Sequence, residues 1–190
     1  MNKNIAIFAS GSGSNAEKII QYFKARKTAQ VVCVFSNKSD AYVLERAQKQ
    51  NIPAQYYPLK DWRQPDIIIQ KLEDLKVDYI ILAGFLLRIP QELIDRYPNK
   101  IINIHPALLP KFGGKGMYGK YVHEAVIKAQ EKESGITIHY IDENYDEGTT
   151  LFQAKCKVLP NDTPDSLAEK VHQLEHEYFP KVIEQIITAK

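Results

Sequence analysis

The chain has 190 residues, which is long enough for one sizeable hydrophobic core and marginal for two. Its 25 Lys and Arg residues against 23 Asp and Glu residues give a formal net charge of +2, which favours neither nucleic acid nor an anionic membrane as a partner. Hydrophobic residues at 44% and charged residues at 25% are typical of a globular domain and exclude a disordered or fibrous chain.

Cysteine usage and the N-terminal segment indicate the compartment. Cys33 and Cys156 stand in apolar runs, without a Cys-x-x-Cys pair or a Cys/His cluster, so we expect reduced thiols and no metal site. The apolar stretch at the N-terminus is too short for a signal peptide, and no segment approaches the roughly 20 apolar residues of a membrane span. These features predict a cytoplasmic protein without a membrane partner. We expect a monomer or homodimer without a nucleic-acid partner.

The first 100 residues alternate short β-branched runs with longer amphipathic stretches. Strands are expected at residues 5–9, 31–36, 56–57, 78–83 and 101–104, and helices at 16–26, 41–50, 67–75 and 91–96. Strands that alternate with helices favour a parallel sheet. The pattern therefore predicts an α/β fold, a single Rossmann-like domain with a mostly parallel sheet covered by helices on both faces.

The later part of the chain changes pattern. A helix is expected at residues 122–129, followed by strands at 135–141 and 151–158 whose acidic connection is typical of a hairpin. This predicts an antiparallel hairpin in the C-terminal half. Thr163, directly before Pro164, is expected to cap a long terminal helix.

A glycine-rich segment follows the first strand at residues 10–15 (Ser-Gly-Ser-Gly-Ser-Asn). Such a loop brings backbone N–H groups and the positive end of the next helix onto an anion. The segment lacks the third glycine of a dinucleotide fingerprint and the Lys of a P-loop, so a phosphate monoester fits better. The alternative is a plain turn capped by Ser or Asn.

A second segment of interest ends the strand expected at 101–104. Asn103 and His105 are two residues apart and should project to the same face, while Pro106 and Pro110 constrain the chain that follows. An amide donor beside an imidazole suits the stabilisation of an oxyanion. A lone histidine at a strand end is more often structural, and the neighbouring Asn and the two prolines shift that balance toward function.

A carboxylate near His105 would keep the imidazole protonated as a donor. Asp142, Glu143, Asp146 and Glu147 all lie in the acidic loop, and the pattern alone does not select one. No serine or cysteine triad and no metal-spaced histidine pair is evident in the sequence. His172 and His176 are expected to flank a helix face.

Several segments, in this order, carry a family resemblance: residues 10–15, 35–38 (Phe-Ser-Asn-Lys), 82–85 (Leu-Ala-Gly-Phe), 103–110 (Asn-Ile-His-Pro-Ala-Leu-Leu-Pro), 137–139 (Thr-Ile-His), 145–148 (Tyr-Asp-Glu-Gly) and 175–176 (Glu-His). Together they resemble the phosphoribosylglycinamide formyltransferase family of folate-dependent enzymes. The resemblance covers nearly the whole chain.

The resemblance implies transfer of the formyl group of 10-formyltetrahydrofolate, a cosubstrate, to the amine of 5'-phosphoribosylglycinamide in purine biosynthesis, without a metal. Asn103 and His105 would polarise the formyl carbonyl, and Asp146 would be the carboxylate that keeps His105 protonated. The substrate-binding residues that it implies are Ser12, Gly13, Ser14, Asn15, Gly84 and Glu175. Those implied for folate are Arg63, Leu86, Leu87, Arg88, Ile89, Asn103, Asp142 and Asp146, with residues 142–146 contacting the pterin.

The resemblance also implies one formyltransferase domain over residues 1–190. Residues 1–100 would form its nucleotide- and phosphate-binding half, and residues 101–190 its catalytic and folate-binding half. We expect no room for the extra domains of tRNA-directed or deformylating relatives.

The sequence departs from the family pattern in two places. The Gly-rich segment at residues 113–119 is a few residues longer than the Pro-Gly-x-His that the family often has there, so we expect a solvated loop and carry over no role from its histidines. The alignment of residues 86–89 with the family pattern is open by one residue.

Two alternative functions remain. One is that of a related enzyme, acting on a sugar nucleotide or on formyltetrahydrofolate by hydrolysis, and the other is that of a non-catalytic nucleotide-binding protein.

Overall fold

The computed structural model describes residues 2–143 and 146–189, and the chain divides into two compact units. The first unit comprises residues 1–102 and 183–190, and the second comprises residues 103–182. In the first unit the helices are α1 (Ser14–Arg26), α2 (Tyr42–Lys49), α3 (Leu59–Arg63), α4 (Asp66–Asp74) and α5 (Gln91–Arg96), and the strands are β1 (Lys3–Phe8), β2 (Ala29–Ser36), β3 (Ala54–Tyr56) and β4 (Tyr79–Leu82).

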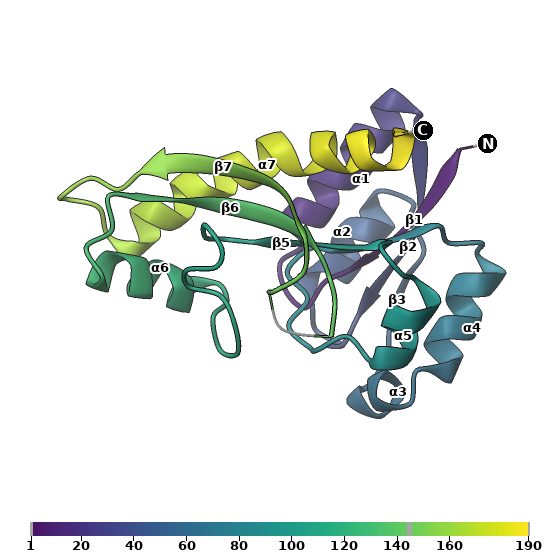
Figure 1. The fold of residues 1–190 in the computed structure, drawn as a ribbon. Coiled ribbons are helices and arrows are strands. Elements are labelled where there is room, and N and C mark those ends of the chain that lie inside the picture. The colour runs from purple at the N-terminus through teal and green to yellow at the C-terminus, as the bar shows by residue number, and fades with distance from the viewer. Residues whose placement is uncertain (1, 144–145, 190) are drawn as a thin grey trace. The chain divides into compact units, whose positions relative to one another are not determined.

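The first unit is built on parallel strands. Strand β1 pairs with β2 and β4, and β2 pairs with β3, all in parallel. The strand order is β3-β2-β1-β4-β5, where only the first two residues of β5 (Ile101–His105) belong to this unit. Right-handed connections between parallel strands place α1 and α2 on one face of these strands and α4 and α5 on the other (Figure 1). The carboxyl ends of β1, β2 and β4 therefore meet at one edge.

An aromatic cluster fills one side of this unit. The ring of Phe8 on β1 lies 5.7 Å from Phe35, 5.1 Å from Trp62 and 5.6 Å from Phe85, measured between centroids. Trp62 is buried and belongs to α3, a helix that the sequence pattern did not predict. Five residues are too few to display helical periodicity, and the helix follows from packing of the indole into the cluster.

The third strand was predicted at residues 56–57, and the structure places β3 at Ala54–Tyr56. Tyr57 leaves the strand because its ring packs into the core, 5.0 Å from Phe35. Its carbonyl oxygen accepts a hydrogen bond from Nε1 of Trp62 (3.0 Å). Because Tyr57 packs into the core, the observed strand lies earlier in the chain than the predicted one.

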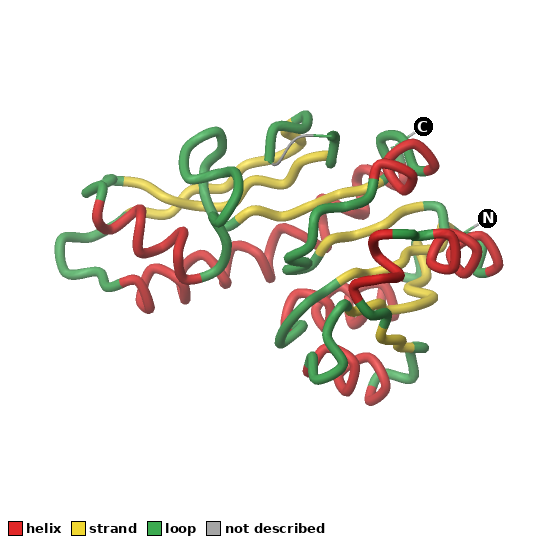
Figure 2. The backbone as a smooth tube through the Cα atoms, turned by 90° about the horizontal axis from the view of Figure 1, so that it is seen from below, coloured by secondary structure: helices red, strands yellow, loops and turns green. Residues whose placement is uncertain are grey.

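The second unit contains the last three residues of β5, α6 (Lys120–Lys128), β6 (Glu133–Tyr140), β7 (Thr150–Lys157) and α7 (Pro164–Thr188) up to residue 182. Its strand order is β5-β6-β7, and β6 pairs with β7 in antiparallel fashion. Figure 2 shows α6 and this part of α7 on one side of the β6–β7 hairpin. The ring of Phe152 on β7 lies 5.1 Å from that of Tyr178 on α7, which joins the hairpin to the helix.

The predicted cap of the terminal helix is confirmed. The backbone N–H of Ser166 donates to Oγ1 of Thr163 (3.2 Å), and the N–H of Thr163 donates back to Oγ of Ser166 (3.0 Å). This reciprocal pair is a capping arrangement, and Pro164 occupies the first helical position, where its missing N–H has no intrahelical partner in any case.

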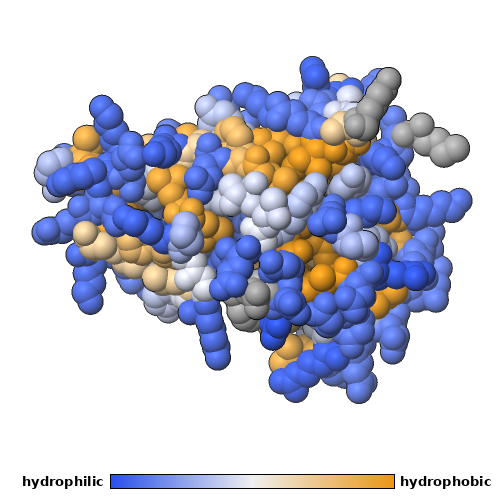
Figure 3. Space-filling model, viewed as in Figure 1, coloured by the Kyte–Doolittle hydropathy of each residue, from blue (hydrophilic) through white to orange (hydrophobic). Residues whose placement is uncertain are grey.

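The predicted α/β class, the mostly parallel strands and the antiparallel hairpin are confirmed. On the face shown in Figure 3, hydrophilic side chains are interspersed with smaller hydrophobic areas. Among the residues that the structure describes, none of the helices combines the length and apolar character needed to cross a membrane.

Candidate functional site

Ser10, in the loop after β1, makes hydrogen bonds to the loops after β2 and β4 at the carboxyl edge of the first unit. Its N–H donates to the carbonyl oxygen of Gly84 (3.0 Å), and its hydroxyl donates to Oδ1 of Asn37 (2.5 Å). The same hydroxyl accepts a hydrogen bond from the N–H of Leu86 (2.9 Å). The loops after β1, β2 and β4 are therefore joined at one buried serine, which brings Gly84 to the glycine loop.

Gly13 begins α1 in a conformation that favours glycine. Its φ is +75°, and a Cβ atom there would lie 2.4 Å from Cγ2 of Val43. Within the described chain, α1 has no side-chain cap, so the alternative of a turn capped by Ser or Asn is wrong in that detail. Ser14 and Asn15 are the first helical residues, and N–H groups in the first turn have no intrahelical partners. The loop thus has the geometry of an anion site.

Helix α2 holds the glycine loop, a role that sequence reasoning missed. The N–H of Val43 donates to the carbonyl oxygen of Gly11 (3.1 Å), and Nε of Arg46 donates to that of Ser12 (2.9 Å). The Arg46 guanidinium also pairs with the carboxylate of Glu17 on α1. No local motif marks Arg46, because the contact joins residues far apart in the chain.

The residues implied for folate in the first unit lie in two places. Arg63 is exposed at the end of α3. Leu86 and Arg88 are exposed and Leu87 is half-buried in the loop after β4, whereas Ile89 is buried, at 5% exposure. Ile89 therefore packs into the core and leaves the other three side chains more accessible.

In the second unit, Asn103 and His105 project to one face of β5, as their spacing predicts. Nδ2 of Asn103 lies 3.1 Å from Nε2 of His139, and Nε2 of His105 lies 2.7 Å from the carbonyl oxygen of Phe112. A carbonyl oxygen only accepts, so Nε2 of His105 carries a proton. His105 is 4% exposed, and its other nitrogen, Nδ1, faces Asp146.

The Asp146 carboxylate lies between two histidines. Its Oδ2 is 3.6 Å from Nδ1 of His105, and its Oδ1 is 3.6 Å from Nε2 of His139. Oδ2 also accepts a hydrogen bond from the N–H of Gly114 (2.9 Å) in the Gly-rich segment. The structure therefore brings together Asn103, His105 and Asp146, and it joins the segment at residues 113–119 to them.

His139 is the residue of this cluster to which sequence reasoning gave no role. It is fully buried, and burial lowers its pKa from the ordinary value. Its Nδ1 donates to the carbonyl oxygen of Tyr140 (3.0 Å). Thr137, on the same face of β6, donates its hydroxyl to Ala107 (2.7 Å) and accepts the N–H of Leu109 (3.0 Å). The two-residue spacing of Thr137 and His139 was the available signal.

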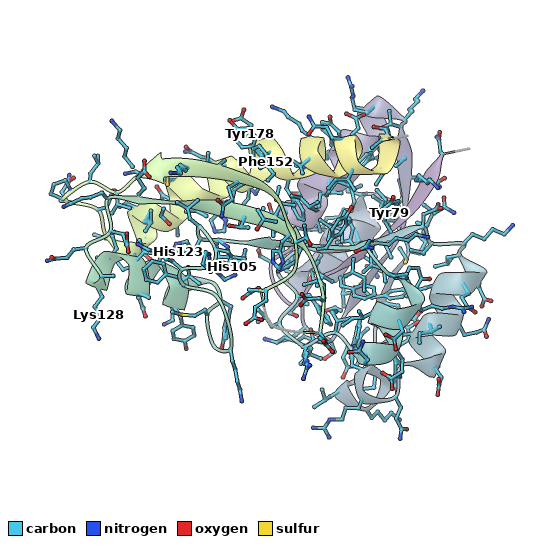
Figure 4. The ribbon with its side chains drawn as sticks, viewed as in Figure 1. Tyr79, His105, His123, Lys128, Phe152 and Tyr178 are labelled. Atoms are coloured by element: carbon cyan, nitrogen blue, oxygen red, sulfur yellow. The ribbon has the colours of Figure 1, made fainter. Side chains whose placement is uncertain are left out.

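Glu175 is buried on α7 and accepts a hydrogen bond from Nδ1 of His172 (2.8 Å), which raises the pKa of His172. The rings of His172 and His176 lie 6.3 Å apart. His123 on α6 is buried, and burial lowers its pKa. Figure 4 shows His123 and His105 close together on α6 and β5.

The remaining predicted site residues lie in the loop between β6 and β7. Asp142 is half-buried, whereas Asn144 and Tyr145 lie outside the described residues.

Cys33 and Cys156 are free, and burial raises the pKa of the Cys33 thiol to about 12. Within residues 2–143 and 146–189, no group of His, Cys, Asp and Glu has the arrangement of a metal site.

The second unit thus presents an amide and an imidazole beside one carboxylate, a set suited to an oxyanion and to proton transfer. The chain belongs to the formyl transferase family, whose model matches residues 3–183. It is 36% identical to phosphoribosylglycinamide formyltransferase of Bacillus subtilis, over 97% of this chain and 95% of that protein.

Plant and structural relatives agree with this family. The chain is 41% identical to the chloroplastic phosphoribosylglycinamide formyltransferase of Arabidopsis thaliana over 95% of its length, but it spans only 64% of that protein. The crystal structure of phosphoribosylglycinamide formyltransferase from Anaplasma phagocytophilum has a TM-score of 0.90 and 35% identity, covering 100% of this chain and 89% of that chain.

Proposed function

We propose that this protein transfers the formyl group of 10-formyltetrahydrofolate to the amine of 5'-phosphoribosylglycinamide in purine biosynthesis. The observation that carries the proposal is the placement of the Asp146 carboxylate between His105 and His139, with Asn103 bound to His139. The names of relatives that match nearly the whole chain support the choice of substrates.

Asn103 and His105 supply the donors for the reaction. Attack of the amine on the formyl carbon forms a C–N bond and places negative charge on the formyl oxygen. An Nδ2–H of Asn103 and the imidazole of His105, at Nδ1, stabilise that charge, because preorganised groups need no reorganisation as it develops. The bond between Nε2 of His105 and the Phe112 carbonyl holds the ring in place, which leaves Nδ1 as its reactive atom.

Asp146 has two tasks in this mechanism. Its carboxylate, 3.6 Å from Nδ1 of His105, offsets positive charge on that ring during the reaction. It also accepts a proton from the attacking amine, directly or through one water, which then passes to the folate nitrogen as the C–N bond to the formyl group breaks. No covalent enzyme intermediate is needed, and the Cys33 thiol is a poor nucleophile because its pKa is about 12.

The substrate-binding residues follow from the same proposal. The loop containing Ser12, Gly13, Ser14 and Asn15 holds the phosphate, with Gly84 beside it, and Glu175 accepts a hydroxyl of the ribose. Arg63, the segment from Leu86 to Ile89, Asp142 and Asp146 serve the folate. The loop of residues 10–15 supports this role because Gly13 opens α1 with N–H groups turned outward.

In this proposal residues 1–190 form one formyltransferase domain. Residues 1–100 bind the nucleotide, and residues 101–190 bind folate and catalyse the transfer. The free thiols of Cys33 and Cys156 accord with a reducing compartment, and we infer the cytoplasm. We propose a monomer or homodimer that acts on small molecules and not on nucleic acid.

A direct assay tests the function. Purified protein is incubated with 10-formyltetrahydrofolate and one of three acceptors: 5'-phosphoribosylglycinamide, an amino sugar nucleotide, or water alone. We expect formyl transfer to the first acceptor only. Product with the sugar nucleotide, or formate release alone, would support the alternative enzymes, and no turnover with any acceptor would support a non-catalytic protein.

A further inference from the structure

The contact between Asn103 and His139 constrains the orientation of the Asn103 amide as well as the positions of the two side chains. Nδ2 of Asn103 lies 3.1 Å from Nε2 of His139, within hydrogen-bond distance. An asparagine amide can be turned by 180° with little change of shape, which exchanges a donor for an acceptor. What His139 presents at Nε2 therefore decides which way the Asn103 amide faces.

The other nitrogen of His139 determines its tautomer. Nδ1 lies 3.0 Å from the carbonyl oxygen of Tyr140, and that oxygen can only accept, so the ring proton is on Nδ1. The side chain has no exposed surface, and burial opposes a second proton. The hydrogen bond to Tyr140 and the charges of Asp146 and Asp142 favour a second proton, but burial, together with His105, outweighs them. Nε2 therefore carries a lone pair.

An acceptor at Nε2 admits only one orientation of the neighbouring amide. Turning the amide would place Oδ1 of Asn103 against the lone pair of His139, two acceptors face to face in a buried site, which is costly. The NH2 group of Asn103 is thus held beside His139, whose Nε2 lies 3.6 Å from Oδ1 of Asp146. One amide hydrogen bonds His139, and the second remains for the formyl oxygen.

We propose that His139 is a positioning residue which, as the neutral Nδ1–H tautomer, fixes the Asn103 amide with its NH2 group turned to the reaction centre. This inference rests on the proposed formyl transfer, because it assigns the donor that meets the oxyanion. His139 touches Asn103 and acts through it. The backbone carbonyl of Tyr140 is in turn what selects the tautomer.

The tautomer is measured directly on the wild-type protein. Nitrogen-15 NMR of the histidine rings at about pH 7.5, with His139 assigned by comparison with a His139 variant, is expected to show a protonated Nδ1 and an unprotonated Nε2. A proton on Nε2, alone or together with one on Nδ1, would overturn the inference. This readout does not depend on any substrate, so it separates failure of the inference from failure of the proposed function.

Two substitutions separate positioning from mere packing. In His139→Gln the terminal amide lies near the former Nε2 and offers an acceptor to Asn103, whereas in His139→Asn it lies near the former Nδ1 and offers none. We expect kcat to fall on the order of 100-fold in His139→Asn, the lower end of the cost of losing an oxyanion donor. The Gln variant is expected to recover most of that loss, and KM for both substrates should stay within about threefold in both variants. Equal losses in the two variants, or losses confined to KM, would contradict the inference.

A double-mutant cycle gives the last test. If His139 acts only through Asn103, His139→Asn should cost on the order of 100-fold in the wild type and roughly nothing further in an Asn103→Ala background. Independent losses that multiply would overturn the positioning role. Circular dichroism and thermal unfolding of each variant ensure that folded proteins are compared.

Discussion

The backbone N–H of Gly114 donates a hydrogen bond of 2.9 Å to Oδ2 of Asp146, the same oxygen that faces Nδ1 of His105 at 3.6 Å. Phe112, two residues before Gly114, accepts a hydrogen bond from Nε2 of His105 through its carbonyl oxygen. The backbone of residues 112–114 therefore holds both members of the His105–Asp146 pair in place. This pair is the centre of the proposed chemistry.

The substitution Asp146→Asn tests the charge at this centre. The amide that it introduces keeps an oxygen that can accept the Gly114 N–H, but it places no negative charge beside His105 and does not accept a proton. We expect kcat to fall by on the order of 100-fold or more, the typical contribution of general acid–base catalysis, with little change in thermal unfolding. Steady-state assays with 5'-phosphoribosylglycinamide measure this. Near-normal turnover in the folded variant would exclude Asp146 from catalysis.

Removing either oxyanion donor should be at least as costly. Asn103→Ala and His105→Ala are each expected to lower kcat by roughly 100- to 1000-fold, since each donor meets charge that develops in the transition state. KM should change much less, because the bond is made mainly in the transition state. Single-turnover assays of each purified variant measure the chemical step. An unchanged chemical step in either variant would remove that residue from the mechanism.

Gly13 and Gly11 form a matched pair in the glycine loop. Gly13 has a φ of +75°, and a Cβ there would meet Val43 at 2.4 Å, whereas Gly11 has no atom within 4 Å of such a Cβ. Gly13→Ala is therefore expected to lower the free energy of unfolding by about 1–3 kcal/mol, and Gly11→Ala to leave it nearly unchanged. Urea denaturation compares them. Equal effects of the two substitutions would show that the fit against Val43 does not matter.

Sequence periodicity was enough to place Asn103 and His105 together, because a strand turns alternate side chains to one face and β5 contains both. It was not enough to choose Asp146, since four acidic residues share the loop and only the family resemblance selected one. The placement depends on how residues of β5, β6 and the loop approach each other. Such approaches join distant parts of the chain and leave no local pattern.

The roles of His139 and Arg46 could not be predicted for the same reason. His139 matters through its bond to Asn103, 36 residues earlier, and through the carbonyl of its neighbour Tyr140. Arg46 matters through the carbonyl oxygen of Ser12, 34 residues earlier. In the absence of the fold, each residue reads as an ordinary buried histidine or surface arginine.

The cap of α7 offers a prediction on stability alone. Thr163 accepts the N–H of Ser166 at 3.2 Å, and Thr163→Ala removes that acceptor. The free energy of unfolding should fall by about 1 kcal/mol, as is typical for the loss of a helix cap. Gln173→Ala, at an exposed position within the same helix, is the control and should stay within about 0.5 kcal/mol of the wild type. A smaller loss for Thr163→Ala than for the control would contradict the capping role.

The pair of His172 and Glu175 predicts a dependence of stability on pH. Glu175 accepts a hydrogen bond from Nδ1 of His172 and raises the pKa of His172 above its ordinary value of about 6.5. A pKa raised by folding means that the native state binds the proton more tightly. The pair therefore stabilises the fold fully below about pH 6.5, and the contribution is lost as the pH rises through the raised pKa of His172.

Glu175→Gln should remove this effect, and Glu177→Gln, an exposed glutamate on the same helix, is the matched control. NMR titration is expected to show the pKa of His172 returning toward about 6.5 in Glu175→Gln and unchanged in Glu177→Gln. The loss in unfolding free energy for Glu175→Gln should be larger at about pH 5.5 than at about pH 8.5, because only the protonated histidine gains from the carboxylate. An equal loss at both pH values, with the pKa of His172 unmoved, would show that Glu175 does not hold the proton on His172.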